Sequence, residues 1–595
     1  MLRLFNTHEV RKVIELEGIW DFVMEGSDKR YRMMVPGCIE QHPDFLDKRG
    51  IGWYTKRIYV ENTTNLKLEF KGVSHTADIY LDDVKLGHHY NAFTPFSVMA
   101  NDVKAGEHEL KVRIDNRFTE ESALHVPNDY YTYGGITRPA AMEQLGDVYI
   151  KNMHFEPFMA EDGWHARIRT VVANISDSVQ TVQVCGRLIA DMLYDNAGNR
   201  IDLFNKIDMN KNADCLQLTD SMTAEDDIVR EIAINKLTSD ITINAASEYV
   251  FEVETAFEDV LAWSSKRPNL YFVKLLISRN GEAVDDYIDR VGFRQVKISG
   301  KDILVNGEKI YMKGFNRHED YATVGCAVPL QLMVQDMDLM QEMNANAVRT
   351  CHYPNDERFL DLCDERGMYV WEENHARGFG LERMQNPNFD RQCRDCIDEM
   401  IENHYNHPSI VIWGILNECA SETEEGRKKY AAQYAQIRSL DKSRPTTSAT
   451  CRHLTDICLD IPDIVSFNMY SGWYKDVPID ETNRTEIDWI RKSGGDNKPI
   501  IVSEFGEAAI YGYRDRAHCK WSEERQADII RDNLKVYMND EDICGVFVWQ
   551  FADCRVTEEE WFATRARCHN NKGVVDEYRR PKLAFDTVKE MYAKR

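Results

Sequence analysis

The chain has 595 residues, of which 43% are hydrophobic and 29% charged, and its formal net charge is −26. At roughly 150 residues per domain, this length predicts about three or four units and excludes a single core. The negative charge argues against a nucleic-acid partner, because phosphate backbones are bound by clustered Lys and Arg. The N-terminal segment lacks the apolar core of a secretory signal, and no apolar run approaches the roughly 18 residues of a membrane span. We therefore expect a cytoplasmic enzyme without a membrane partner.

The cysteines predict reduced thiols. There are 15 of them, an odd number scattered over a long chain, which is not the pattern of a disulfide framework. Cys393 and Cys396 form a Cys-x-x-Cys motif in a predicted helix, with no second pair to complete a metal site. Since no His/Asp cluster with ligand spacing occurs either, we expect no metal and no cofactor.

The first half of the chain is predicted to be all-β. Short runs that alternate apolar and polar residues, such as 66–70 and 110–114, are separated by turn signals and favour a β-sandwich over residues 1–158. Similar runs at 166–172 and 249–253 predict a second sandwich, of immunoglobulin-like size, over residues 159–295.

From residue 296 onward, short apolar strands alternate with amphipathic helices. This alternation over residues 296–595 predicts a (β/α)8 TIM barrel, with its chemistry at the C-terminal ends of the strands. The strand candidates are 310–315, 345–350, 368–373, 410–417, 446–450, 464–469, 500–504 and 546–551, and the helix candidates are 329–343, 356–366, 389–405, 424–440 and 522–538.

Two of the predicted strands end in a glutamate. Glu418 follows the fourth strand and Glu504 ends the seventh, so both should face the same mouth of the barrel. A retaining glycosidase needs two such carboxyl groups about 5–5.5 Å apart, one to protonate the leaving oxygen and one to attack the anomeric carbon. The alternative is that both are unrelated solvated loop residues.

Four motifs resemble signatures of glycoside hydrolase family 2. They lie at residues 131–139, 313–320, 349–354 and 406–418, in the order that the family has them. The resemblance implies a sugar-binding-like jelly roll, an immunoglobulin-like sandwich and a catalytic barrel. It also implies that Glu418 is the acid/base and Glu504 the nucleophile, and that the protein forms a homo-oligomer, a tetramer or dimer.

The same resemblance implies a set of sugar contacts. Asn417, beside the acid, would bind the 2-hydroxyl, a contact that tightens in the transition state. His318, His352, Tyr470, Tyr474 and Trp549 fall where the family places ring contacts and an aromatic floor, and Asp320 and Glu373 are secondary candidates. Each of these side chains has packing as its alternative role.

One motif beyond the last strand bears on the sugar. Asn570-Asn571-Lys572 resembles the Asn-x-Lys motif of β-glucuronidases, in which Asn and Lys hold the C6 carboxylate, and residues 468–474 resemble a segment that brings Tyr474 near it. We therefore expect a retaining exo-β-glycosidase that acts on β-D-glucuronides as small molecules or oligosaccharides. A solvated loop Lys is the alternative.

Other positions depart from the glucuronidase pattern. Ala376-Arg377-Gly378 stands where Ala-Val-Gly is usual, so Arg377 would favour an axial C4 hydroxyl, as in a β-galacturonidase or a dual β-hexuronidase. Asp147 loosely matches an aspartate that contacts C4, and the short segment 378–388 predicts an open mouth. A β-galactosidase and a non-catalytic carbohydrate-binding protein are the remaining alternatives.

Overall fold

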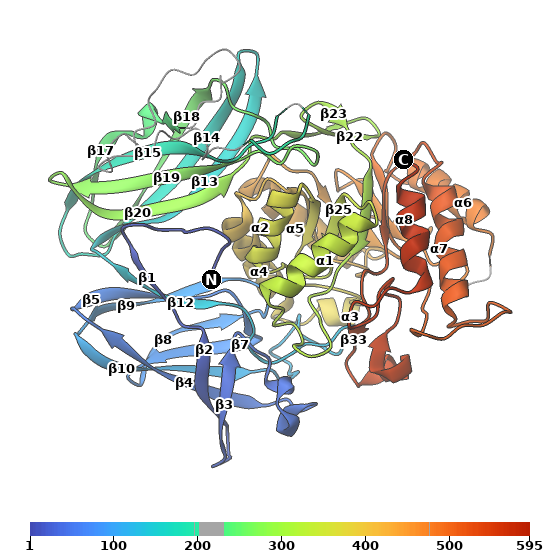
Figure 1. Ribbon diagram of the computed structural model, residues 1–595, viewed down its shortest axis with the longest axis horizontal. Coiled ribbons are helices and arrows are strands. Elements are labelled where there is room, and N and C mark those ends of the chain that lie inside the picture. The colour runs from blue at the N-terminus through green and yellow to red at the C-terminus, as the bar shows by residue number, and fades with distance from the viewer. Residues whose placement is uncertain (196, 202–230, 475–476) are drawn as a thin grey trace.

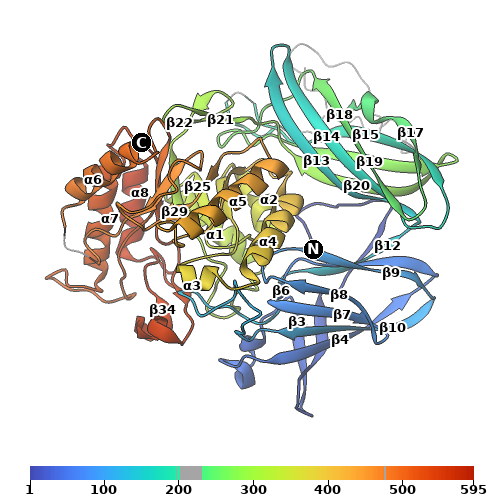
Figure 2. The same ribbon diagram turned by 180° about the vertical axis from the view of Figure 1, so that it is seen from behind.

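The computed structural model describes residues 1–195, 197–201, 231–474 and 477–595. Two β-sandwiches lie on one side of a barrel, and the barrel's last helices lie on its far side (Figure 1). The same arrangement is seen from behind in Figure 2. The predicted order of two sandwiches followed by a TIM barrel is confirmed.

The first sandwich packs a four-stranded sheet, in the order β1-β12-β5-β9, against a six-stranded sheet, in the order β3-β2-β4-β10-β7-β8. Alternation along the strands makes this core; in β10, for example, Leu110, Val112 and Ile114 are buried and the residues between them are not. The strands are β1 (Lys12–Glu15), β2 (Gly18–Met24), β3 (Arg30–Val35), β4 (Ile51–Val60), β5 (Thr64–Phe70), β6 (Val73–Ser74), β7 (Thr76–Leu81), β8 (Val84–Tyr90), β9 (Phe96–Val103), β10 (Gly106–Asp115), β11 (Gly135–Ile136) and β12 (Ala140–Leu145).

The second sandwich begins with β13, which pairs with β14 along nearly its whole length. The expected boundary at residue 158 therefore falls inside a strand of this sandwich, because the chain passes from β12 to β13 through a short turn. A sheet in the order β13-β14-β18 faces one in the order β16-β15-β19-β20, with β17 paired to β15. The strands are β13 (Val148–Ala160), β14 (Gly163–Asn174), β15 (Gln180–Met192), β16 (Glu231–Ala233), β17 (Ser239–Ile243), β18 (Ser247–Phe257), β19 (Leu270–Arg279) and β20 (Glu282–Val291).

A small sheet of β21 (Val296–Ser299), β22 (Asp302–Val305) and β23 (Glu308–Lys309) leads into the barrel. The barrel strands are parallel, and β24 pairs with both β25 and β32, which closes the circle between the first and last strands. The fifth position is shared by two short strands. The barrel strands are β24 (Met312–Asn316), β25 (Ala347–Thr350), β26 (Tyr369–Glu373), β27 (Ile410–Gly414), β28 (Thr446–Thr447), β29 (Ala449–Thr450), β30 (Val465–Asn468), β31 (Ile500–Phe505) and β32 (Ile543–Val548).

Helices surround the barrel, and several begin at a side chain that caps them. Asp356, Thr423 and Ser522 accept hydrogen bonds from the first free backbone N–H groups of α2, α5 and α7. The sequence analysis did not single out α6. The helices are α1 (Leu330–Glu342), α2 (Glu357–Arg366), α3 (Leu381–Met384), α4 (Phe389–His404), α5 (Glu424–Leu440), α6 (Ile479–Lys492), α7 (Glu523–Tyr537) and α8 (Leu583–Tyr592).

The Cys-x-x-Cys motif is part of the packing of α4. Cys393 and Cys396 are both buried there and carry free thiols. Among the described residues, no helix combines the length and the apolar character that crossing a bilayer requires.

A long loop of the first sandwich reaches the mouth of the barrel. On this loop, between β10 and β11, the hydroxyl of Tyr130 lies 2.9 Å from Nε2 of His375, and Arg138, between β11 and β12, donates to the Glu319 carboxylate at 2.6 Å. All four side chains are buried. The sandwich is therefore fixed against the face of the barrel on which the candidate active site lies.

Candidate active site

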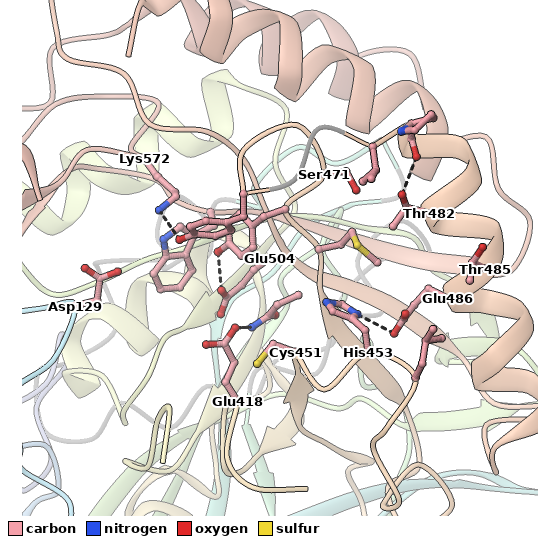
Figure 3. A pocket seen from close by; sticks show the side chains of 18 of the residues that line it. Asp129, Glu418, Cys451, His453, Ser471, Thr482, Thr485, Glu486, Glu504 and Lys572 are labelled. Carbon is pink, nitrogen blue, oxygen red and sulfur yellow. Dashed lines mark hydrogen bonds and ion pairs between the residues drawn. The ribbon is translucent and has the colours of Figure 1, made fainter. Parts of the chain in front are cut away.

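Glu418 and Glu504 line the same cavity, which has a volume of about 750 Å³ and lies at the C-terminal ends of the barrel strands (Figure 3). Glu504 is part of β31 itself, whereas Glu418 follows the end of β27. The backbone at Glu418 has φ 53°, a left-handed conformation, and its N–H donates to the carbonyl of Ala449 at 2.8 Å. This turn directs the carboxyl group into the cavity.

The Glu504 carboxylate is held by two donors. Arg349 Nη1 donates to its Oε1 at 2.8 Å, and the hydroxyl of Tyr470 donates to its Oε2 at 2.7 Å. Burial and the nearby charge of Glu418 raise the pKa of Glu504 to about 7, although both donors act in the opposite direction. Near neutral pH this carboxyl group is therefore close to its titration point, and its donors favour the ionised form.

Arg349 forms hydrogen bonds with several side chains around Glu504. Its guanidinium also donates to Glu373, with Nε–Oε2 and Nη2–Oε1 distances of 3.0 and 2.8 Å, and to Asn417 Oδ1 at 2.8 Å. Burial raises the pKa of Glu373 to about 7, and the charge of Arg349 lowers it. One buried cation thus orients two carboxyl groups and the amide next to Glu418.

The amide of Asn417 has one end free. Its Oδ1 accepts from Arg349, while its buried Nδ2 has no hydrogen-bond partner among the described residues. A buried donor without an acceptor is costly unless a ligand supplies one. Asn417 is therefore placed to donate to a bound hydroxyl group.

The environment of Glu418 is more open. Its Oε1 accepts from Asn468 Nδ2 at 2.9 Å, and its Oε2 lies 3.8 Å from Arg377 Nη2. The side chain is 18% exposed, compared with 4% for Glu504. Arg377 also donates to Asn128 Oδ1 of the first sandwich at 2.9 Å.

His318, His352 and Trp549 form an aromatic cluster beside Glu504. The ring of His352 stacks on that of Trp549 with centroids 5.1 Å apart, and His318 meets Trp549 edge-on at 5.5 Å. Burial lowers the pKa of His318 to about 3 and holds that of His352 well below its usual value. Both imidazoles are therefore neutral, and their buried Nε2 atoms have no partner within the described parts of the chain.

Lys572 lies at one end of the cavity with its side chain in an aromatic cage. Its ammonium group is 5.5–5.7 Å from the ring centroids of Tyr470, Trp473 and Tyr474, and it donates to the Tyr474 hydroxyl at 3.4 Å. Burial lowers the pKa of Lys572. Among the described residues, no carboxylate lies within ion-pair distance of this ammonium group.

Asp129 and Arg565 are side chains that the sequence analysis missed. Both line the cavity near Lys572. Arg565 forms a two-pronged ion pair with Asp129, with Nε–Oδ1 and Nη2–Oδ2 distances of 3.0 and 2.6 Å, and Asn570 Nδ2 donates to Asp129 Oδ2 at 3.0 Å. The available sequence signal was the segment 127–131, in which two tyrosines follow an aspartate and which overlaps the start of the motif at 131–139.

Three predicted residues lie elsewhere or play supporting roles. Asp147 is exposed in the turn between β12 and β13 and does not line the cavity, because the first sandwich presents Asp129 there instead. Asp320 is buried and accepts from the hydroxyl of Tyr133 at 2.7 Å. Glu373 acts on Arg349 and His352, whose Nδ1 lies 2.8 Å from its Oε1.

Two groups of side chains have ligand atoms close enough to hold a metal, a clustering that the sequence did not predict. His318, Cys351 and His352 form one, next to Glu504, and Asp361, Asp364 and His407 form the other. In the second group, Asp361 is already paired with Arg3 at 2.8 Å, and Asp364 lies 2.6 Å from the His407 imidazole. Glycoside hydrolysis by two carboxyl groups requires neither of these two clusters.

Comparison with known proteins assigns the chain to a family. Residues 296–595 match the family model described as glycosyl hydrolases family 2, TIM barrel domain. The chain belongs to glycosyl hydrolase family 2. Residues 52–169 match the model described as glycosyl hydrolase 2 galactose-binding domain-like, and residues 148–294 match the model described as glycosyl hydrolases family 2. This family 2 protein is therefore a glycoside hydrolase.

Individual relatives of this family 2 enzyme cover nearly its whole length. A crystal structure of a β-galacturonidase from Eisenbergiella tayi bound to galacturonate is 44% identical, with a TM-score of 0.89, and covers 100% of this chain and 99% of its own. A β-glucuronidase from Streptococcus agalactiae is 26% identical over 98% of this chain and 96% of its own. A β-galactosidase from Thermoanaerobacterium thermosulfurigenes is 26% identical, over 87% of this chain and 65% of its own.

Proposed function

We propose that this enzyme is a retaining exo-β-uronidase, which releases a terminal hexuronic acid from β-linked conjugates. The observation that carries the proposal is the buried ammonium group of Lys572, in the same cavity as Glu418 and Glu504. A buried cation without a counter-ion is unfavourable, and a carboxylate bound beside it would remove that cost. A neutral sugar would leave the cation unpaired, which argues against a β-galactosidase.

In the proposed mechanism Glu504 attacks the anomeric carbon while Glu418 protonates the leaving oxygen. The bond from Glu504 to the anomeric carbon forms as the bond to the leaving oxygen breaks, which gives a glycosyl-enzyme. Glu418, now ionised, then takes a proton from water, whose oxygen displaces Glu504. Asn417 Nδ2 would donate to the 2-hydroxyl throughout, most strongly in the oxocarbenium-like transition states.

The two donors on Glu504 support this division of roles. Arg349 and Tyr470 both donate to Glu504 and stabilise its ionised form, which is the form that attacks. Glu418 accepts from the neutral amide of Asn468, and its contact with Arg377 is longer, at 3.8 Å.

We further propose galacturonides, ahead of the glucuronides that the Asn-x-Lys motif first indicated, as the preferred substrates. The similarity to the Eisenbergiella tayi β-galacturonidase, at 44% identity over the whole chain, supports this preference over the 26% identity to β-glucuronidases. Arg377 supports it too, since this cation lies beside Glu418 where the glucuronidase pattern has an apolar residue.

The test is a set of initial rates on the p-nitrophenyl β-D-galacturonide, β-D-glucuronide and β-D-galactoside, measured in parallel with Glu504→Gln as the inactive control. We expect kcat/KM to fall in that order. Proton NMR of an early time point should show the β-anomer of the released sugar. A faster galactoside would contradict the uronidase proposal, and an α-anomer would contradict retention.

A further inference from the structure

The cavity continues past the two carboxyl groups, away from Lys572. In Figure 3, Lys572 and Asp129 lie at one end, Glu418 and Glu504 in the middle, and Thr482, Thr485 and Glu486 of α6 at the other end. We call this second end, lined by the first half of α6 and by His453, Leu454 and Met469, the α6 pocket.

The position of the α6 pocket identifies what it would hold. A uronate whose carboxylate meets Lys572 has its anomeric carbon between Glu504 and Glu418, since these groups must reach that carbon and its leaving oxygen. The aglycone is attached to the same carbon, and its oxygen must reach Glu418, so it lies on the Glu418 side of the cavity, away from Lys572. It therefore extends into the α6 pocket.

The two ends of the cavity carry opposite charges. Lys572, Arg565 and Arg377 supply cations around the proposed uronate position. The α6 pocket presents the carboxylates of Glu481 and Glu486, and His453 is its one titratable nitrogen group among the described lining residues, with Nδ1 3.1 Å from Glu486 Oε1. The remaining lining side chains there include Leu454, Met469 and Val477, which are apolar.

Glu486 and Glu481 lie at different depths in the α6 pocket. Glu486 is buried, and among the described residues the one basic side chain within ion-pair distance of it is the imidazole of His453, so its carboxyl group is poorly screened by solvent. Glu481 is exposed one turn earlier on the helix, at the rim. A carboxylate on the aglycone would meet both like charges.

We propose that the α6 pocket is an aglycone subsite that selects apolar aglycones that are uncharged or cationic, and that Glu481 and Glu486 exclude acidic ones, including a second uronic acid. This inference rests on the proposed uronidase function. It makes the enzyme one that cleaves uronic acids from apolar conjugates and not one that shortens polyuronate chains.

The test uses three phenyl β-D-galacturonides that carry a methyl, a carboxylate or a trimethylammonium group at the meta position, together with a β-linked digalacturonic acid reduced at its free end. For the wild-type enzyme we expect the carboxylate substrate to have the lowest kcat/KM of the three, by about fivefold or more relative to the methyl substrate. Reduced digalacturonic acid should be the poorest of the four.

Variants separate the effect of the pocket's charge from the different reactivities of the leaving groups. For each enzyme, kcat/KM on the carboxylate substrate is divided by kcat/KM on the methyl substrate. Glu481→Gln should raise this ratio about two- to fivefold, and Glu486→Gln should raise it at least as much. Asp480→Asn is the matched control, since Asp480 is on the same helix and exposed but does not line the cavity, and it should leave the ratio unchanged.

The outcomes are distinguishable. Equal rates on the three phenyl substrates, or a ratio that none of the variants changes, would overturn the aglycone inference while cleavage of the methyl substrate upholds the uronidase proposal. Failure to cleave any uronide would overturn both. Because Glu481 is exposed, its variant should fold normally even if replacement of the buried Glu486 disturbs the helix.

Discussion

The surroundings of Glu504 and the surroundings of Lys572 differ in how their charges are balanced. We call the first the strand-borne end of the site and the second the loop-built end. Around Glu504, the cation of Arg349 is paired within the protein, to both Glu504 and Glu373. Around Lys572, the ammonium group has aromatic rings and a phenol, but no carboxylate of the described residues lies within ion-pair distance of it. The first arrangement orients groups for a reaction, whereas the second is incomplete until an anion binds.

The two ends also differ in their origin along the chain. Arg349, Glu373 and Glu504 all belong to barrel strands, so a rigid sheet sets their distances. Lys572 and Asp129 come from a segment beyond the last strand and from a loop of another domain. Under the proposed function, bond cleavage would depend on side chains of the barrel strands and sugar choice on side chains from loops.

Replacing Glu504, the proposed nucleophile, should cause the largest loss of activity, because it removes a reacting group and leaves Lys572 in place. For Glu504→Gln we expect kcat/KM on every substrate to fall by at least about 10⁴-fold, since no glycosyl-enzyme can form. Binding of galacturonate, followed by calorimetry, should persist because Lys572 is untouched. A variant that keeps a tenth of the wild-type rate would refute the assignment of Glu504.

Replacing the acid should give a loss that depends on the leaving group. Glu418→Gln should lower the rate by about 10²- to 10⁴-fold for alkyl uronides, whose leaving oxygen needs a proton. The loss for glycosyl-enzyme formation from 2,4-dinitrophenyl uronides, measured as a pre-steady-state burst, should be much smaller. Equal losses for both classes would contradict the role of Glu418.

A substitution at the loop-built end, near Lys572, should lower the activity on uronides selectively. Asp129→Asn removes the counter-charge of Arg565 and an acceptor for Asn570, so we expect a loss of about tenfold to a hundredfold in kcat/KM on uronides, mainly through KM. The exposed Asp147→Asn is the control and should behave as wild type. If Asp147→Asn gave the larger loss, the placement of these two residues would be wrong.

The smallest predicted effect is a change in pH dependence. The hydrogen bond from Tyr470 lowers the pKa of Glu504, which burial raises to about 7, so Tyr470→Phe should raise that pKa further. Glu504 must be ionised to attack, and the low-pH limb of kcat/KM should therefore move to higher pH, by about half to one unit. A shift of this limb to lower pH would contradict the account.

The sequence predicted that Glu418 and Glu504 lie at one face of the barrel, and the structure places both on one cavity. Glu418 and Glu504 each close an apolar run, and parallel strands of a barrel deliver their ends to one face, so proximity follows from the fold alone. Asn417 is adjacent to Glu418 in the chain and was predicted with it. The role of Arg349 was missed, since an arginine inside a strand has no visible partner until the neighbouring strands are placed.

The loop-built end was predicted only in part. Lys572 and Asn570 were found through a local motif, but Asp147 was chosen in place of Asp129 because nothing in the spacing of a β-sandwich says which of its loops meets the barrel. The pairing of Asp129 with Arg565 joins residues more than 400 positions apart, and such contacts depend on how two domains dock. Helix α6, which lines the far end of the cavity, was likewise not singled out.

The most direct test of the division between the two ends is the kcat/KM of Lys572→Met on p-nitrophenyl β-D-galacturonide relative to the β-D-galactoside. The account predicts a loss of about 10²- to 10³-fold on the galacturonide, because its carboxylate loses its buried partner, and an unchanged or higher value on the galactoside. An equal loss on both substrates, or a preserved preference for the uronide, would contradict the claim that Lys572 selects the sugar.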